Sequence, residues 1–284
     1  MKETNKKTLT IGFSPCPNDT FIFDALVNRK IETGSYHFEP ILEDVETLNR
    51  WALQGKLDIS KISYGVWPSV MEKYALLNSG SALGKGVGPL LISTKKSDDF
   101  RTWMNDLTVA IPGEHTTAHL LFSMAFPFAQ KKRFMIFSEI EQAVLSGEVD
   151  CGVIIHESRF TYAQKGLVKW LDLGDYWEQQ TGVPIPLGGI VMKNNFDNQL
   201  IAEVDGLIKQ SLEFAFKHYP QLPQYVREHS QEMDEQVMRK HINLYVTDYS
   251  LSLGEEGRRA VKKLLEIYEQ VNHEPVQQED MFLN

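Results

Sequence analysis

A histidine directly after a short apolar run is the first residue whose type and position could do chemistry. His156 follows residues 152–155, which we expect to form a buried strand, so its imidazole would lie at the strand end. The pKa of an unperturbed imidazole is about 6.5, so His156 can accept a proton near neutral pH. A hydrogen-bonded structural histidine is the alternative. Glu157 and Arg159 could orient the imidazole or bind a substrate, and a surface ion pair is the other interpretation for both.

Two threonines at an expected helix start offer a second chemical feature. Thr116 and Thr117 follow residues 112–115, and the helix is expected to begin at this point. Their hydroxyls and the backbone amides of the first turn would form an anion site. A simple N-cap is the alternative interpretation.

Residues 12–21 lead from a strand into a helix and carry several polar side chains. Two prolines restrict the backbone, while Ser14, Asn18 and Asp19 lie beside helix amides that have no partner within the helix. Such a helix start can hold an anion without a cation. Residues 18–20 can also serve as a plain cap for a helix expected from about residue 21 to 28.

Short apolar runs that alternate with amphipathic stretches indicate an α/β protein. We expect strands at 9–13, 37–42, 57–63, 90–93, 107–111, 135–137, 149–155, 168–173 and 190–192. We expect helices at 21–28, 44–54, 66–74, 116–126, 140–146, 201–218, 221–230, 234–246 and 255–270.

Two Gly/Pro-rich segments divide this pattern. Residues 80–89 and 184–189 each precede an apolar strand, and we interpret the strands that follow as a paired crossover between two lobes. The expected division is a larger discontinuous lobe, 1–93 plus 190–284, and a smaller inserted α/β lobe, 94–189.

Composition narrows the classes of partner. The net charge of −9, from 29 basic and 38 acidic residues, disfavours nucleic acid, and no apolar run is long enough to cross a membrane. The amino-terminal residues lack the apolar core of a signal peptide, so we expect a cytoplasmic protein. Cys16 and Cys151 are expected to be reduced, partly buried thiols without a metal cluster of their own.

Five ordered blocks resemble the 1,4-dihydroxy-6-naphthoate synthase family of the futalosine route to menaquinone. The blocks are residues 12–21, 42–49, 80–90, 112–117 and 154–162. The likeness covers nearly the whole chain and is weakest at 97–105 and in the last twenty residues.

The resemblance implies a two-lobed fold of the periplasmic-binding-protein type (type II), with two crossover strands and the ligand in a cleft between the lobes. It implies a carbon–carbon lyase that converts cyclic dehypoxanthine futalosine to 1,4-dihydroxy-6-naphthoate, with no metal and no cofactor. His156 would be the base.

The same resemblance assigns substrate contacts to Ser60, Lys61 and Ile62 and to the threonine pair, where the family can carry Thr in place of Ser60. Lys61 could neutralise a substrate carboxylate, although a solvated lysine is the alternative. Ser14, Asn18, Asp19 and Arg159 are further candidates.

The expected partner is a small-molecule carboxylate, and an oligomer remains open. Two other functions compete with the lyase: chorismate dehydratase of the same pathway, and a non-catalytic binding or sensor protein that closes on a small carboxylate. The segment from Ser14 to Thr20 and the context of His156 favour the lyase.

Overall fold

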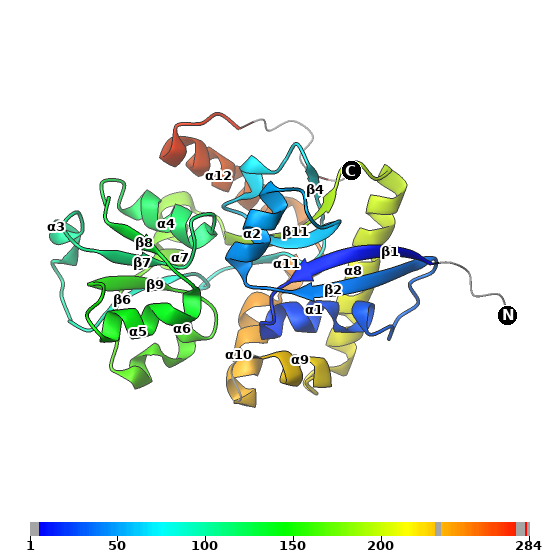
Figure 1. Ribbon diagram of the computed structural model, residues 1–284, viewed down its shortest axis with the longest axis horizontal. Coiled ribbons are helices and arrows are strands. Elements are labelled where there is room, and N and C mark those ends of the chain that lie inside the picture. The colour runs from blue at the N-terminus through cyan, green and yellow to red at the C-terminus, as the bar shows by residue number, and fades with distance from the viewer. Residues whose placement is uncertain (1–5, 231–233, 277–281, 283–284) are drawn as a thin grey trace.

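The computed structural model describes residues 6–230, 234–276 and 282, which form two β-sheets lying side by side (Figure 1). The first sheet contains β1 (Lys7–Phe13), β2 (Tyr36–Leu42), β3 (Ile59–Ser63), β4 (Tyr74–Leu76), β5 (Ala82–Gly84) and β11 (Ile185–Lys193). The second contains β6 (Leu90–Ser93), β7 (Val109–Ile111), β8 (Lys132–Phe134), β9 (Cys151–Ile154) and β10 (Val168–Asp172).

Helices surround both sheets. They are α1 (Pro17–Val27), α2 (Val45–Leu53), α3 (Phe100–Trp103), α4 (Thr117–Ala125), α5 (Ile140–Leu145), α6 (Ser158–Thr161), α7 (Leu173–Thr181), α8 (Asn198–His218), α9 (Gln224–His229), α10 (Glu235–Tyr245), α11 (Asp248–Leu251) and α12 (Gly254–Asn272). Short 3-10 turns are η1 (Trp67–Ser69), η2 (Phe137–Glu139) and η3 (Tyr162–Lys165). Figure 1 shows α3 to α7 around the second sheet and α1, α8, α9 and α10 beside the first.

Each sheet mixes parallel and antiparallel pairs. In the first, β1 pairs in parallel with β2 and β3, and β11 runs antiparallel to β3, β4 and β5. In the second, β7 is parallel to β8 and β9, while β6 is antiparallel to β9 and β10. The carboxyl ends of β1 and β3 therefore lie at one edge of the first sheet, where they can contribute side chains to a common site.

The chain passes between the sheets twice, before β6 and before β11, which confirms the two expected crossovers. The strands that follow them, β6 and β11, belong to different sheets and do not pair with each other. Strand pairing places residues 90–93 in the second sheet and 185–189 in the first. The division into lobes at 93/94 and 189/190 stays a prediction, and the pairing favours boundaries at 85–89 and 182–184.

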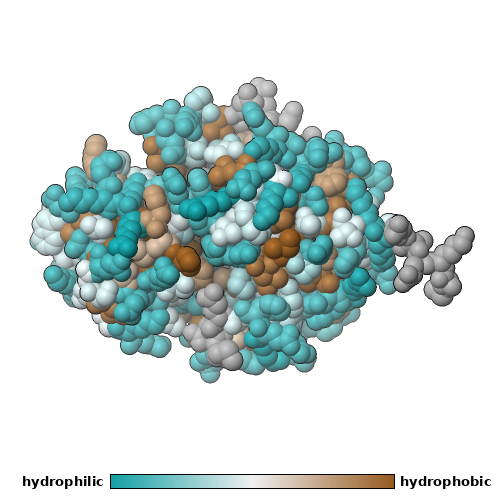
Figure 2. Space-filling view, viewed as in Figure 1, coloured by the Kyte–Doolittle hydropathy of each residue, from teal (hydrophilic) through white to brown (hydrophobic). Residues whose placement is uncertain are grey.

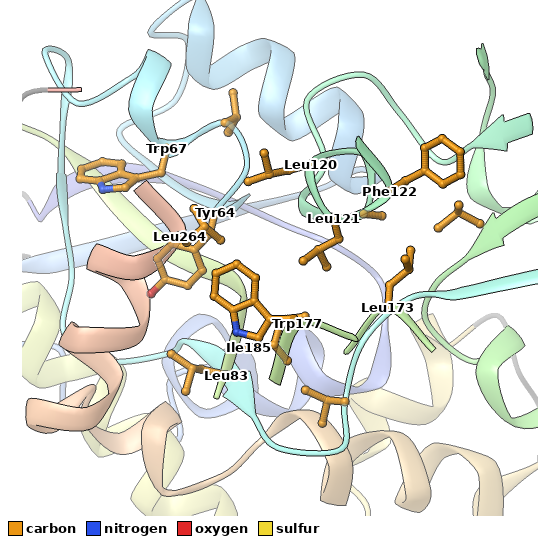
Figure 3. Close-up of a cluster of buried hydrophobic side chains, with 14 of the residues drawn as sticks. Tyr64, Trp67, Leu83, Leu120, Leu121, Phe122, Leu173, Trp177, Ile185 and Leu264 are labelled. Carbon is orange, nitrogen blue, oxygen red and sulfur yellow. The ribbon is translucent and has the colours of Figure 1, made fainter. Parts of the chain in front are cut away.

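Strand periodicity decides which core each side chain enters. On β6, Leu91 packs into a cluster that also contains Trp67, Trp177 and Leu264. Leu90 and Ile92 pack on the opposite face of the sheet. Figure 3 shows that the first cluster draws aromatic and aliphatic side chains from both lobes and from α12. This cluster therefore joins the two sheets through apolar contact.

Three expected elements are wrong for local reasons. Helix α1 begins at Pro17 rather than near residue 21, because proline fits the first helical position; Asn18 and Asp19 therefore lie inside the first turn. The helix expected at 66–74 is the 3-10 turn η1 followed by β4. The strand expected at 135–137 lies earlier, as β8, where it continues the parallel pairing with β7.

Four helices were not expected at all, α7 and the short α3, α6 and α11. The first turn of α7 is capped by the Asp172 side chain, which accepts hydrogen bonds from the amides of Gly174 and Asp175. A cap supplied by the last residue of a strand leaves no loop between strand and helix, which hides the boundary in the sequence.

Hydrophilic residues predominate on the face shown in Figure 2, with hydrophobic residues in small separate areas. Across the described residues, no helix combines the length and hydropathy needed to span a membrane.

The closest backbone approach between the first crossing and α7 yields a stability prediction. A Cβ atom on Gly174 would lie 1.8 Å from the Val87 carbonyl oxygen, so Gly174→Ala must displace the crossing segment. We expect a loss of about 1–3 kcal/mol in the free energy of unfolding, measured by urea denaturation. Gly206→Ala, inside α8 with open space around its Cβ, is the control and should gain about 0.5–1 kcal/mol. Equal effects of the two substitutions would contradict this account.

Candidate active site

A cavity of about 100 Å³ lies between residues of the two sheets. The first sheet and its connections, together with α10, supply one side, and the loops after β7 and β9 supply the other. Its lining is Ser14, Asn18, Asp19, Val45, Leu48, Lys61, Ile62, Ser63, Ala82, Gly88, Pro89, Thr116, Thr117, Ala118, Ile155, His156, Leu187, Gly188, His241 and Tyr245. Most of the residues predicted from sequence therefore converge on one place.

His156 lines this cavity from the end of β9 with an unusual backbone. Its φ angle is +58°, in the left-handed region that is uncommon for residues other than glycine and tends to occur at functional sites. Its Nε2 atom is buried and has no hydrogen-bond partner among the described residues. Burial lowers the pKa of His156, although the neighbouring Glu157 opposes this. The imidazole is therefore held in the neutral form that can accept a proton.

Glu157 is buried beside two imidazoles rather than paired at the surface. Its Oε1 atom lies 3.4 Å from Nδ1 of His241, which is itself buried in α10. Burial alone would raise the pKa of Glu157, but His241 and then His156 outweigh it and lower the pKa to about 2. A fixed negative charge therefore lies next to the His156 imidazole.

The Cys16 thiol contacts Nδ1, the second ring nitrogen of His156. Cys16 Sγ lies 3.4 Å from His156 Nδ1, and the residue stands immediately before α1. Burial, followed by the charge of Glu157, raises the pKa of Cys16 well above its usual value. The thiol is therefore protonated, and the contact restricts the orientation of the imidazole ring.

Asp19 organises the polar groups of the first-sheet side. Its Oδ2 accepts from the Ser14 hydroxyl at 2.7 Å and from the Ser14 amide at 3.2 Å, and its Oδ1 accepts from Asn18 Nδ2 at 2.8 Å. Lys61 Nζ lies 3.6 Å from Asp19 Oδ1 and donates to the Gly80 carbonyl at 2.5 Å. Burial lowers the pKa of Lys61, opposed by Asp19. The Asn18 Oδ1 atom is buried and has no hydrogen-bond partner within the described part of the chain, so it can accept a hydrogen bond from a ligand.

The threonine pair joins the two sides of the cavity. Thr116 caps α4: its Oγ1 accepts from the His119 amide and donates to the Gly113 carbonyl. Thr117 Oγ1 donates to the Leu187 carbonyl at 2.7 Å and accepts from the Gly65 amide at 3.0 Å. The N-cap interpretation of Thr116 is therefore correct, and the position at the positive end of α4 still suits an anion.

Two predicted residues lie outside the cavity lining. Ser60 is buried on β3 next to Lys61 but is not among the lining residues; its hydroxyl donates to the Lys61 carbonyl. Arg159 donates to the carbonyls of Gly86 and Gly88 and to Asp172. These contacts occupy its guanidinium and hold the first crossing segment against the second sheet.

Sequence reasoning missed His241 and Tyr245. Both reach the cavity from α10, one helical turn apart, and burial raises the pKa of Tyr245 so that its phenol stays protonated. The i, i+4 spacing of a histidine and a tyrosine on an amphipathic helix was the available signal, but it equally describes ordinary core residues. Only the packing of α10 against α1 and β5 brings them to the site.

Comparison with solved structures defines the class of fold. A crystal structure of a protein from Archaeoglobus fulgidus matches with a TM-score of 0.88 at 31% identity, covering 94% of this chain and 98% of that one. The ligand-binding component of an ABC-type import system from Staphylococcus aureus matches at 0.73 with 12% identity, covering 98% and 97%. The chain has a two-lobed, periplasmic-binding-protein-like fold, which confirms the predicted fold class.

The sequence also matches the menaquinone biosynthesis family over residues 9–270. Two relatives carry the name 1,4-dihydroxy-6-naphtoate synthase. The one from Thermus thermophilus is 45% identical over 91% of this chain and 93% of its own, and the one from Streptomyces coelicolor is 40% identical over 91% and 92%. The chain belongs to the menaquinone biosynthesis family and is an enzyme, as the five sequence blocks predicted.

The buried pair of Asp19 and Lys61 yields a test of the site's electrostatics. Their side chains are only 5% and 6% exposed, so removing either charge leaves the other uncompensated. We expect Asp19→Asn or Lys61→Met alone to lower the free energy of unfolding by about 3 kcal/mol, and the double variant to recover part of that loss. Urea denaturation of all four proteins measures the coupling.

The exposed pair of Arg227 and Glu235 is the matched control, since both side chains are nearly half exposed. Its coupling should stay below about 1 kcal/mol. Strictly additive effects at Asp19 and Lys61 would show that the two charges do not interact.

Proposed function

We propose that this protein converts cyclic dehypoxanthine futalosine to 1,4-dihydroxy-6-naphthoate, with His156 as the general base. One observation carries the choice of base: the buried Nε2 of His156 lines the cavity and has no hydrogen-bond partner among the described residues. The names of the two relatives support the reaction.

The surroundings of His156 suit a base of this kind. In the tautomer whose Nδ1–H donates to the Cys16 sulfur, the neutral imidazole presents its Nε2 lone pair to the cavity, and Glu157 stabilises the imidazolium once the proton is taken up. Proton removal starts the cleavage of the carbon–carbon bond to the sugar-derived portion. The remaining ring becomes aromatic, and this gain in stability favours cleavage of the carbon–carbon bond. No residue of the protein is oxidised or reduced in the reaction.

The substrate carboxylate would lie at the start of α4, near Thr116 and Thr117, with the helix dipole favouring its negative charge. Asn18, with its unpartnered amide oxygen, would accept from a substrate hydroxyl. Ser14, Asp19, Lys61 and Ile62 complete the lining on the first-sheet side. Ser60 and Arg159 would then act by supporting neighbouring backbone rather than by touching the substrate.

We infer that the lobes separate further to admit this substrate. The free volume of the cavity between them is about 100 Å³, below the about 300–1,000 Å³ of pockets that hold small organic ligands. The two crossing segments, 85–89 and 182–184, are the natural hinges. Small-angle scattering should record a more open molecule without substrate than with it.

A chorismate dehydratase is the competing enzyme function. One incubation separates the two: purified protein is mixed with cyclic dehypoxanthine futalosine, and in parallel with chorismate, and the products are followed by mass spectrometry. Dihydroxynaphthoate should form from the first compound, and chorismate should be recovered unchanged. Recovery of both compounds unchanged would contradict the proposed reaction. The proposal includes a cytoplasmic location and a small-molecule substrate, with neither nucleic acid nor membrane as a partner.

His156→Gln tests the assigned base. Because glutamine keeps the polarity but cannot accept the proton, turnover should fall by about 10²–10⁴-fold while substrate still binds, as measured by calorimetry. His115→Gln is the control, since that side chain lies outside the cavity lining, and its turnover should match the parent. Parent-like turnover in His156→Gln would assign the proton transfer to another group.

A further inference from the structure

We propose that Cys16, His156 and Glu157 form a binding site for zinc or a similar divalent transition-metal ion, and that the bound ion inhibits the enzyme. These three residues each offer one ligand atom, and the three atoms lie within 4.8 Å of one another. They come from the start of α1 and from the end of β9, so the site depends on the contact between the two lobes.

The spacing of sulfur and nitrogen suits one shared ion. A tetrahedral zinc ion with bonds of about 2.3 Å to a thiolate and about 2.0 Å to an imidazole holds the two atoms about 3.5 Å apart. Cys16 Sγ and His156 Nδ1 are 3.4 Å apart. The ion would therefore require little movement of either side chain.

A buried carboxylate oxygen of Glu157 is the second observation that favours a bound cation. The Oε1 atom of Glu157 is buried without a hydrogen-bond partner among the described residues, and Glu157 is only 8% exposed. An anionic oxygen in this position costs free energy unless a cation lies nearby. His241 lies 3.4 Å from the same oxygen and would hold the carboxylate in place from outside the ligand set.

The chemical types of the three ligands indicate which metals the site would bind. One thiolate, one imidazole and one carboxylate favour zinc and its neighbours, whereas magnesium and calcium require oxygen ligands. On binding, the Cys16 thiol releases its proton to solvent and forms the sulfur–metal bond, with no oxidation or reduction. The cavity that reaches His156 gives the ion a path to the site.

Inhibition follows from the nitrogen that the ion occupies. An ion on Nδ1 leaves the proton of the neutral imidazole on Nε2, so the ring has no lone pair left to accept a proton from a substrate. This consequence rests on the proposed role of His156, whereas the binding site itself does not.

Cobalt(II), a spectroscopic substitute for zinc, tests the site directly. The full-length protein, titrated with Co²⁺, should bind one ion per chain and develop the near-ultraviolet charge-transfer absorption of a thiolate ligand. Zn²⁺ should displace it, and Mg²⁺ should not. Cys151→Ser is the matched control, because Cys151 is also buried but lies in β9 outside the group of ligands. The absorption should persist in Cys151→Ser and disappear in Cys16→Ser.

Absence of the absorption in the parent protein, or its persistence in Cys16→Ser, would overturn the proposal. If Cys16→Ser does not fold, as judged by circular dichroism, Glu157→Gln decides. Loss of a direct ligand should weaken Co²⁺ affinity at least about ten-fold, since even residues behind the ligands cost about 10–100-fold, and unchanged affinity would refute the site.

Activity is measured separately. In the parent, turnover should fall with added Zn²⁺ at the same midpoint as binding and return with a chelator. Full turnover with zinc bound would overturn the inhibitory role. Absence of turnover in the metal-free parent would instead count against the proposed reaction and leave the binding result intact.

Discussion

The Thr117 hydroxyl, which donates to the Leu187 carbonyl and accepts from the Gly65 amide, ties the start of α4 to the first sheet. A Cβ on Gly65 would lie 2.8 Å from the backbone of Thr116 and Thr117, so glycine permits this approach. Nearby, the Glu46 carboxylate accepts a hydrogen bond from the His115 amide, and the Asn49 side chain donates one to the His115 carbonyl. These hydrogen bonds join the two lobes beside the cavity. Any opening of the lobes must therefore replace them with hydrogen bonds to water.

Charge inside the cavity is balanced locally although the chain as a whole is acidic. Asp19 lies opposite Lys61, Glu157 lies against two imidazoles, and the positive end of α4 faces the same space. Each buried charge has a counterpart, which limits the free energy lost to desolvation. The two parts of the cavity therefore favour different charges. The start of α4 favours an anion, whereas burial favours the neutral form of the His156 imidazole.

His156 lies where three constraints meet. Its backbone is in the left-handed region, its Nδ1 contacts the Cys16 thiol, and its ring packs 4.7 Å, centroid to centroid, from Phe137. Such confinement suits a base that must hold one orientation. The same confinement brings a thiol and a carboxylate close to the imidazole, so the geometry that orders the proposed base also creates the proposed metal site.

The sequence by itself determined the fold class and the family and singled out His156 as a candidate base, because strand periodicity, helix caps and ordered motifs are local and survive in one dimension. It also led to Thr116, Thr117 and the polar start of α1, which are properties of neighbouring residues. Only the tertiary structure decided that Ser60 and Arg159 lie outside the cavity lining, that His241 and Tyr245 line it, and that Cys16 contacts His156. These contacts join residues up to 140 positions apart, as Cys16 and His156 are, and depend on how the helices pack across two crossings of the chain. Local pattern carries no information about such long-range approach.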